Sequence, residues 1–337
     1  MSIRVGINGF GRIGRDVVRG IMLREDLPFE LVALNASGDW NVMAHLFKYD
    51  TIYRRYPGDI KVVDKGFEID GQLIQITDQR DPEQIPWKEM NVDLVIDTTG
   101  AFKDRAGVDK HFKAGAKKVI ITAPTKEEDI TIVMGVNDDQ YDPEKHHYIS
   151  NASCTTNCLA PVAKVISDTF GIERGLMTTI HAYTNDQNIH DAKHKSDMRR
   201  ARAAAENIIP TSTGAAKAVA LVLPELKGKL TGYALRVPVP TGSVTDVTFE
   251  LSKEATVEEI NAAIKEAAEG KMKGVLAYTE DPIVSSDIIA DNHSSIFDAK
   301  LTLVQDKMVK VVAWYDNEWG YSQRVIDLAA MVASKLN

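Results

Sequence analysis

The chain has 337 residues, of which 44% are hydrophobic and 26% are charged. This length predicts about two domains, each large enough to bury a core of its own. No apolar run approaches the roughly 20 residues of a membrane span, and a net charge of −8 argues against a nucleic-acid-binding role. The composition is that of an ordinary soluble enzyme.

The first half of the chain alternates between short apolar segments and amphipathic segments. Strands are predicted over residues 3–7, 29–34, 92–97, 118–122 and 131–133, and helices over residues 12–22 and around Val108, Phe112 and Ala116. This alternation predicts a parallel sheet with crossover helices. Residues 60–77 interrupt it and predict a hairpin that turns at Asp70 and Gly71.

A glycine-rich turn joins the first predicted strand to the first predicted helix. Gly9 permits a tight turn, Gly11 lets backbone N–H groups approach a pyrophosphate, and Gly14 allows close packing of helix on strand. The pattern predicts a dinucleotide site with the diphosphate at the helix N-terminus. The alternative is a glycine turn that binds nothing.

The end of the second predicted strand lacks an acid that an NAD site usually carries. An acid that binds the ribose 2′-hydroxyl is expected there, but the chain has Asn35, Ala36 and Ser37. Without a carboxylate at Ala36, we expect NADP to be accepted as well as NAD, up to a preference for NADP. Ser37 and Arg80 are candidate donors to a 2′-phosphate. The other interpretation is that NAD is still used, with one contact fewer.

The second half of the chain has a different pattern. Strands are predicted over residues 175–181, 234–239 and 309–315, and Val247, Phe249 and Leu251 alternate as on a half-buried antiparallel strand. Thr256 and Glu259 form a capping box that opens a helix ending near Gly270, and a last helix covers residues 318–336. This half is predicted to be an α+β domain with a mostly antiparallel sheet.

The two cysteines of the chain, Cys154 and Cys158, lie together at the start of a predicted helix, and His181 follows on a predicted strand. This arrangement predicts a Cys154 thiolate activated by the imidazole of His181. The helix dipole and a His181 cation would both lower the thiol pKa. Cys158, one turn further on, is interpreted as a structural neighbour.

Other interpretations of the cysteines are weaker. Cys154 could be a small buried hydrophobe. The pair could bind a metal with His146 and His147, but no second pair at ligand spacing follows, so no metal is expected. A disulfide between residues i and i+4 of a helix has poor geometry. Two cysteines without a signal peptide indicate a reducing cytoplasm.

Taken together, the glycine turn, the Ser153–Cys158 segment and the segment around His181 resemble phosphorylating glyceraldehyde-3-phosphate dehydrogenase. The resemblance runs from about residue 3 to the end of the chain, and it includes residues 207–217, 235–238 and 314–321. It implies a doubly wound (Rossmann) cofactor domain over residues 1–153, completed by the helix over 318–337. A catalytic domain over residues 154–317 lies between them in the sequence.

The resemblance also implies a reaction. Cys154 would attack the aldehyde of D-glyceraldehyde 3-phosphate, and His181 would accept the hydroxyl proton of the hemithioacetal. Hydride would pass to NAD or NADP, and inorganic phosphate would release the resulting thioester as 1,3-bisphosphoglycerate, in glycolysis or gluconeogenesis. The backbone N–H of Cys154 and His181 would stabilise the developing oxygen charge.

Further site residues follow by position from the resemblance. Thr184 and Arg236 match the site for the substrate phosphate, and Ser153, Thr213 and Gly214 match the site for the attacking phosphate. Thr155 and Arg199 are further substrate or phosphate candidates. The expected cofactor-binding residues are Gly9, Gly11, Arg12, Ile13, Gly14, Asn35, Ala36, Ser37, Arg80, Thr122, Lys193 and Asn317, with Asn317 on the nicotinamide carboxamide.

Two departures from the family pattern concern the cofactor. Most NAD-using members carry Asp at the position of Ala36, and a Leu-Pro pair where this chain has Ala192 and Lys193. In the family tetramer this loop approaches a neighbour's adenosine ribose, so Lys193 favours NADP, as in photosynthetic relatives. We therefore expect a homotetramer. The basic cluster over residues 199–202 is either a subunit contact or a solvated face.

Two alternatives in function stay open at this point. One is an erythrose-4-phosphate dehydrogenase of the same superfamily. The other is a non-catalytic protein that binds RNA, another nucleotide or a protein partner. No specific nucleic-acid or membrane partner is encoded, and the expected ligands are a small-molecule substrate and inorganic phosphate.

Overall fold

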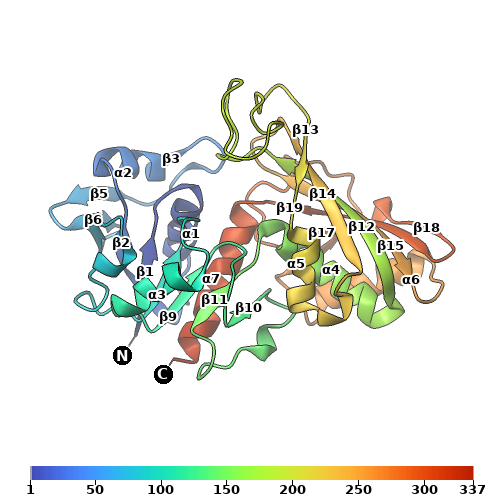
Figure 1. Cartoon of the computed structure of the whole chain (residues 1–337), viewed down its shortest axis with the longest axis horizontal. Coiled ribbons are helices and arrows are strands. Elements are labelled where there is room, and N and C mark those ends of the chain that lie inside the picture. The colour runs from blue at the N-terminus through green and yellow to red at the C-terminus, as the bar shows by residue number, and fades with distance from the viewer. Residues whose placement is uncertain (1, 337) are drawn as a thin grey trace. The chain divides into compact units, whose positions relative to one another are not determined.

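The computed structural model describes residues 2–336, which form two compact units (Figure 1). Unit 1 comprises the described residues up to Ile132, Asp138–Ala152 and the residues from Ser322 onward. Unit 2 comprises Val133–Asn137 and Ser153–Tyr321. Each unit contains one large sheet with its own helices.

Unit 1 is built on a nine-stranded sheet in the order β10-β11-β9-β8-β1-β2-β7-β6-β5. All pairings from β10 to β7 are parallel, and only β7–β6 and β6–β5 are antiparallel. The strands are β1 (Ile3–Asn8), β2 (Phe29–Asn35), β5 (Ile60–Val63), β6 (Gly66–Ile69), β7 (Gln72–Thr77), β8 (Leu94–Asp97), β9 (Lys118–Ile121), β10 (Ile130–Thr131) and β11 (Tyr148–Ser150). The predicted doubly wound parallel sheet is confirmed.

The helices of unit 1 follow the predicted alternation. They are α1 (Arg12–Met22), α2 (Trp40–Lys48), α3 (Arg105–Lys113) and most of α7 (Trp319–Ser334); a small ladder pairs β3 (Tyr49–Asp50) with β4 (Arg54–Arg55). The predicted hairpin turn is confirmed between β6 and β7, where Asp70 and Gly71 both have positive φ, 50° and 84°.

One predicted helix is too long. Ala116 was expected within it, but α3 ends at Lys113. Gly115 has a φ of +113° and the N–H of Ala116 bonds back to His111 O at 3.0 Å, which is the hydrogen bond of a Schellman C-cap. The chain therefore leaves the helix at a glycine, and Ala116 is buried in the connection to β9.

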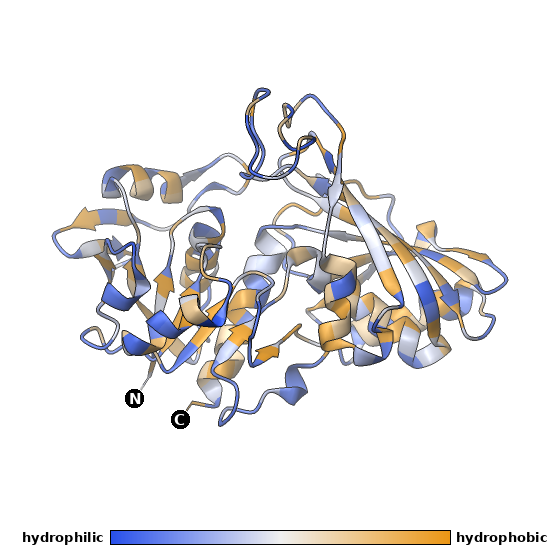
Figure 2. Ribbon diagram, viewed as in Figure 1, coloured by the Kyte–Doolittle hydropathy of each residue, from blue (hydrophilic) through white to orange (hydrophobic). Residues whose placement is uncertain are grey.

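The hydrophobic core of unit 1 is formed by side chains of the apolar sheet strands and of the segments that pack against them. Trp87, Val95, Val108, Val119 and Tyr148 belong to one buried cluster. Figure 2 shows hydrophobic residues concentrated along the strands and on the helices that flank them. Burial on both faces explains why these strands are continuous apolar runs, without polar alternation.

Unit 2 contains an eight-stranded sheet in the order β13-β14-β12-β15-β19-β17-β16, with β18 also paired to β19. Most pairings are antiparallel, as predicted; β12–β14 and β16–β17 are parallel. The strands are β12 (Ile172–Ala182), β13 (Ile209–Ser212), β14 (Leu230–Val237), β15 (Ser243–Leu251), β16 (Leu276–Thr279), β17 (Ser295–Asp298), β18 (Leu303–Gln305) and β19 (Met308–Tyr315). Alternate residues of β15 are buried, as expected.

The long helix α4 (Cys154–Phe170) covers this sheet and packs on β12, β15, β17 and β19. Two further helices, α5 (Ala215–Val222) and α6 (Val257–Glu269), pack against α4. The capping box predicted at the start of α6 is present in both directions. Short 3₁₀ turns lie at Pro82–Gln84, Asp138–Gln140, Pro224–Leu226 and Ala299–Leu301.

Candidate active site and nucleotide cleft

Cys154 is the first residue of α4 and lies beside an imidazole of the central strand. Ser153 is the N-cap of the helix, and its hydroxyl accepts a hydrogen bond from Thr156 N at 3.1 Å. Cys154 Sγ is 3.5 Å from Nε2 of His181, near the end of β12. The structure therefore brings the predicted nucleophile and base into contact.

Electrostatics at this pair differ from the sequence-based expectation. Burial raises the pKa of the Cys154 thiol, and the nearby Arg236 guanidinium only partly offsets that rise. Burial, and then Arg236, lowers the pKa of His181 to about 3. The expectation that a His181 cation lowers the thiol pKa is therefore wrong. Both shifts disfavour charge on the pair, because burial opposes the thiolate and the imidazolium alike.

The other ring nitrogen of His181 has two competing partners. Nδ1 lies 2.7 Å from Ala182 O, which requires a proton on Nδ1, and 2.8 Å from Arg236 Nη1, which requires a lone pair there. A neutral ring serves one of them at a time. Only the tautomer that donates to Ala182 leaves Nε2 able to accept a proton from Cys154. The hydrogen bonds of Arg236 thus bear on whether His181 can act as a base.

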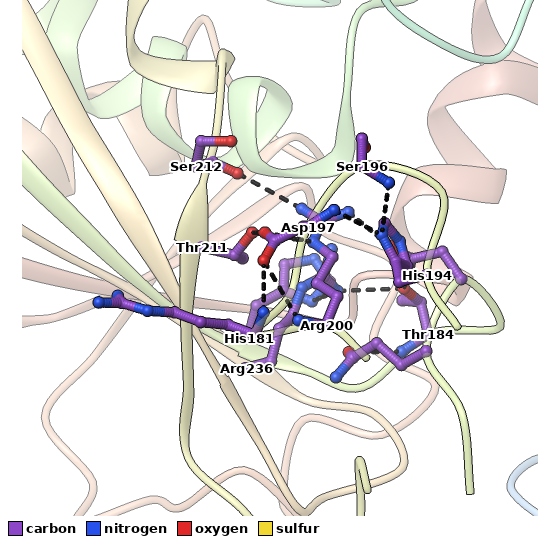
Figure 3. A network of polar contacts seen from close by, with 12 residues as sticks. His181, Thr184, His194, Ser196, Asp197, Arg200, Thr211, Ser212 and Arg236 are labelled. Atoms are coloured by element: carbon purple, nitrogen blue, oxygen red, sulfur yellow. Dashed lines mark hydrogen bonds and ion pairs between the residues drawn. The ribbon is translucent and has the colours of Figure 1, made fainter. Parts of the chain in front are cut away.

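Figure 3 shows the polar network that extends from Arg236. Arg236 Nη1 donates to Thr184 Oγ1 at 3.2 Å, so these two predicted phosphate ligands lie together. Thr184 donates in turn to the Asp186 carboxylate, which pairs with Arg200. Arg200 Nε donates to Thr211 Oγ1 at 2.9 Å. The hydroxyl of Thr211 donates to a second carboxylate, that of Asp197, at 2.6 Å, so the network contains two arginines, two threonine hydroxyls and two carboxylates.

The predicted role of Arg199 is not supported by its position. Arg199 is exposed, and its backbone N–H bonds to Asp197 Oδ1 at 2.8 Å. The side chain that joins the Arg236 network is that of Arg200, which is half-buried. Adjacent arginines in a loop cannot be distinguished by sequence pattern, and the sequence reasoning missed both Arg200 and Asp186.

Ser153, Thr213 and Gly214 lie at the ends of two neighbouring helices. Thr213 Oγ1 accepts from Ala215 N at 3.2 Å at the start of α5, while Thr156 Oγ1 of α4 is 3.4 Å from Ala215 O. A Cβ placed on Gly214 would meet no atom within 4 Å, so the backbone there is open. Two helix N-termini thus meet at hydroxyl groups, an arrangement that suits an anion.

Thr155 does not face a ligand as expected. Its hydroxyl is 2.8 Å from the phenol oxygen of Tyr315, which also lies 2.9 Å from Thr179 Oγ1. All three residues are buried, and burial raises the pKa of Tyr315 well above its usual value. Thr155 therefore anchors the Tyr315 ring, which packs edge-on against His181.

Cys158 lies at the position expected of a structural neighbour. Its thiol is fully buried, 3.5 Å from Thr245 Oγ1 and 3.7 Å from Ala313 O. Burial raises the pKa of this thiol to about 12. Both cysteines are free.

In unit 1 the three glycines form the turn expected of a pyrophosphate cradle. Gly9 has a φ of +102°, and a Cβ on Gly14 would lie 2.3 Å from Gly9 O. Gly11, the N-cap of α1, has open space in the direction of a side chain and no side-chain cap. The first amides of α1 are thus accessible to an anion, and the turn fits a dinucleotide diphosphate.

A cleft of about 390 Å³ opens beside this turn, over the ends of β1, β2 and β7. Its lining includes Asn35, Ala36, Ser37 and Arg80, all predicted cofactor residues. Asn35 is buried and hydrogen-bonded to Asn8 at 2.8 Å. Ser37 does not offer a free hydroxyl, because Oγ donates to the Asp78 carboxylate.

Beneath the cleft runs a buried polar chain that the sequence reasoning missed. Asn8 Nδ2 donates to Asp97 Oδ2 at 2.7 Å, and Asp97 Oδ2 is 3.1 Å from His111 Nε2. Trp87 Nε1 donates to His111 Nδ1 at 3.1 Å, so the His111 proton lies on Nε2 and faces Asp97. The chain ties the carboxyl ends of β1 and β8 to α3 and fixes the floor of the cleft.

The remaining predicted cofactor residues are distributed over both units. Arg12 and Ile13 begin α1, where the Arg12 guanidinium pairs with Asp50 and lies 3.6 Å from Asp16. Thr122 follows β9, with its hydroxyl donating to Asp97 O at 3.1 Å. Lys193 is exposed in a loop of unit 2. Asn317, also in unit 2, accepts from Ser243 Oγ at 2.8 Å, which fixes the orientation of its amide.

Two negative findings concern residues 2–336 alone. Within them, no three His, Cys, Asp or Glu side chains gather in a way that could hold a metal ion. In the same range, no helix has both the length and the apolar character needed to cross a membrane.

The two thiols should differ sharply in reactivity. We expect iodoacetamide to alkylate Cys154 at least about tenfold faster than Cys158, because the Cys154 side chain is partly exposed, whereas Cys158 is fully buried and its pKa is raised to about 12. Peptide mass spectrometry over a time course measures both rates. Cys154→Ser serves as the control and should show only the slow reaction; equal labelling of both thiols would refute the assignment.

The depressed pKa of His181 predicts a loss of stability in acid. In the unfolded chain His181 binds a proton below its ordinary pKa of 6.5, whereas in the folded protein it does so only below a pKa of about 3. Protons therefore bind preferentially to the unfolded chain between these two pH values, and the free energy of unfolding falls progressively as the pH falls from 6.5 to about 3. Between pH 7 and pH 5 wild type should lose about 2 kcal/mol more than His181→Asn, whose side chain does not titrate. Urea unfolding at equal protein concentration measures this difference. A parallel decline in both proteins would contradict the buried neutral imidazole.

Comparison with known proteins identifies the chain. Residues 3–105 match the family "Glyceraldehyde 3-phosphate dehydrogenase, NAD binding domain", and residues 153–317 match "Glyceraldehyde 3-phosphate dehydrogenase, C-terminal domain". The chain is 60% identical to a glyceraldehyde-3-phosphate dehydrogenase of Streptomyces coelicolor, with 100% of both chains covered. It is 60% identical to one of Geobacillus stearothermophilus over 99% of each chain, and 57% identical to glyceraldehyde-3-phosphate dehydrogenase 1 of Bacillus subtilis over 99% of each. The chain belongs to the glyceraldehyde-3-phosphate dehydrogenase family.

Proposed function

We propose that the protein catalyses the phosphorylating oxidation of D-glyceraldehyde 3-phosphate to 1,3-bisphosphoglycerate, reversibly, with NAD or NADP. The observation that carries this proposal is the 3.5 Å contact between Cys154 Sγ and His181 Nε2. Two separate sets of polar groups in the same unit, around Arg236 with Thr184 and around Thr213, have the chemistry that suits anions. Two relatives that are each 60% identical to this chain are named for the same substrate.

The first half of the reaction uses the neutral pair. As Cys154 Sγ bonds to the aldehyde carbon, the thiol proton passes through His181 Nε2 to the aldehyde oxygen, which gives a hemithioacetal. His181, neutral again, then takes the hydroxyl proton as the carbon is oxidised to a thioester. The nicotinamide ring, when bound, supplies the hydride acceptor, and Asn317 is proposed to hydrogen-bond its carboxamide.

The second half of the reaction transfers the acyl group. Inorganic phosphate attacks the thioester carbon, the carbon–sulfur bond breaks, and the acyl phosphate leaves while Cys154 regains a proton from His181. Ser153, Thr213 and Gly214 are proposed to hold this phosphate at the two helix ends. Hydroxyls and a backbone N–H suit an ion that must depart with the product.

Arg236 and Thr184 are proposed to hold the phosphate of the sugar, with Arg200 in place of Arg199 as the second cation of this region. Arg236 has a further consequence for the base. When Arg236 donates to a phosphate, Nδ1 of His181 is left to donate to Ala182, and Nε2 becomes the proton acceptor. Substrate binding would thereby favour the reactive tautomer.

The nucleotide is proposed to bind unit 1, with its diphosphate at Gly9, Gly11, Arg12, Ile13 and Gly14. Since position 36 carries no carboxylate, we propose that NADP is accepted alongside NAD. Asn35, Ser37, Arg80 and Thr122 are retained as residues of this region. We also propose that the protein is a homotetramer, in which Lys193 is a candidate contact to the 2′-phosphate. A cytoplasmic location is proposed as well.

The alternatives are less well supported. The comparisons do not favour an erythrose-4-phosphate dehydrogenase. Contact between Cys154 and His181 argues against a purely binding role, because such a role needs neither a thiol nor a base in reach of each other.

The two phosphate sites should separate in kinetics. Arg236→Leu should raise KM for glyceraldehyde 3-phosphate by about tenfold or more, since a charge-assisted contact is lost, with little effect on KM for phosphate-free glyceraldehyde. Thr213→Ala should mainly raise KM for inorganic phosphate. Steady-state rates with both aldehydes, at varied phosphate, measure this. Equal increases in both constants for both variants would contradict the allocation.

The assembly is tested by mass in solution. Multi-angle light scattering at micromolar concentration should give four times the chain mass of 37.2 kDa. Exposed apolar side chains such as Leu176, Ile189 and Ile208 suit subunit contacts. A monomer mass would refute the tetramer.

The nucleotide preference is tested at position 36. Ala36→Asp should lower kcat/KM with NADP by about tenfold or more, because a carboxylate there repels a 2′-phosphate. Ala36→Asn, which has the same shape without the charge, is the matched control and should lower it far less. A wild-type enzyme with no NADP turnover would refute the acceptance of NADP.

A further inference from the structure

The residue next to Ala36 across the sheet is an acid. β2 and β7 pair in parallel up to Asn35 and Thr77. Ala36 and Asp78 each lie one residue beyond that pair, and Ala36 N donates to Thr77 O at 2.8 Å. The carboxylate missing at position 36 is therefore present on the adjacent strand end.

Asn35 holds both neighbours of Asp78 in place. Its Oδ1 accepts from Thr77 Oγ1 and from Gln79 N, both at 2.9 Å, and its Nδ2 donates to Gln79 O at 2.8 Å. Asn35 is itself buried and bonded to Asn8. The backbone of Asp78 is thus fixed on both sides, although its side chain is exposed.

The Asp78 carboxylate contacts the rim of the cleft through Ser37, although Asp78 itself is not one of the lining residues. One oxygen accepts the hydroxyl proton of Ser37, and Ser37, Ala36 and Gln79 all line the cleft. Ser37 cannot give the same proton to a 2′-phosphate. Arg80, two residues further on, lines the same cleft with the opposite charge.

We propose that Asp78 supplies the ribose-recognising carboxylate that position 36 lacks and sets the balance between NAD and NADP. This inference rests on the proposed binding of a dinucleotide in the cleft. The carboxylate accepts a hydrogen bond from a 2′-hydroxyl and repels a 2′-phosphate, while Arg80 attracts the phosphate. The wild-type protein accordingly binds NAD more tightly than NADP, without excluding NADP.

The test is calorimetric titration of the full-length wild-type and variant proteins with NAD and with NADP. Asp78→Asn keeps the shape of the side chain and removes its charge. It should lower Kd for NADP by about tenfold and raise Kd for NAD by a few-fold. The ratio of kcat/KM values for the two nucleotides should shift in the same direction.

Asp39 offers a matched control in the same segment. It is exposed and caps α2 through Asn41 N at 2.7 Å, and Asn is an equally good N-cap. Asp39→Asn should change neither Kd by more than about twofold. If Asp39→Asn shifts the ratio and Asp78→Asn does not, the discriminating charge is at the α2 cap and the proposal is wrong.

A double variant tests whether a carboxylate at position 36 can replace the carboxylate of Asp78. In the Asp78→Asn background, Ala36→Asp should restore the wild-type preference for NAD, because it returns a carboxylate to the neighbouring strand end. If the ratio of the Kd values for NADP and NAD is unchanged in Asp78→Asn while NAD still binds normally, the proposed role of Asp78 is wrong but the dinucleotide site stands. Failure of wild type to bind either nucleotide would instead overturn the dinucleotide site itself.

Discussion

The parallel pairing of β12 with β14 is the constraint on which the geometry of unit 2 depends. Its register places His181 opposite Arg236. Helix α4 packs on the sheet of which β12 is a member, and this packing delivers Cys154 to the other side of the imidazole, 3.5 Å from Nε2. The proposed nucleophile, base and phosphate-binding cation therefore come from three elements whose positions are set by sheet register and helix packing.

This arrangement disfavours charge on both Cys154 and His181. Burial opposes charge on both Cys154 and His181, and Arg236 adds to the effect on the imidazole. Arg236 is also the group proposed to bind the sugar phosphate. The site is thus proposed to gain a competent base when substrate engages the guanidinium, which links specificity for a phosphorylated aldehyde to the proton transfer.

Much of the fold and part of the candidate site could be predicted from the sequence, and the predictions that failed did so for definite physical reasons. Apolar runs predicted both sheets, and the Cys154 and His181 motifs identified the pair, because these depend on local pattern. The pKa shifts of Cys154 and His181 could not be predicted, since they depend on how deeply the packed structure buries each side chain. Arg200 was missed because neighbouring loop residues face different ways, and Asp78 because its relation to Ala36 depends on the pairing of two distant strands.

The central claim is that Cys154 forms the acyl enzyme with His181 as its base. The most direct measurement is intact-protein mass spectrometry of rapid-quench samples after mixing with glyceraldehyde 3-phosphate and NAD in the absence of phosphate. The account predicts a thioester on Cys154, none in Cys154→Ser, and formation slowed by roughly 10²–10⁴-fold in His181→Asn. An adduct that persists in Cys154→Ser, or a rate unaffected by His181→Asn, would contradict it.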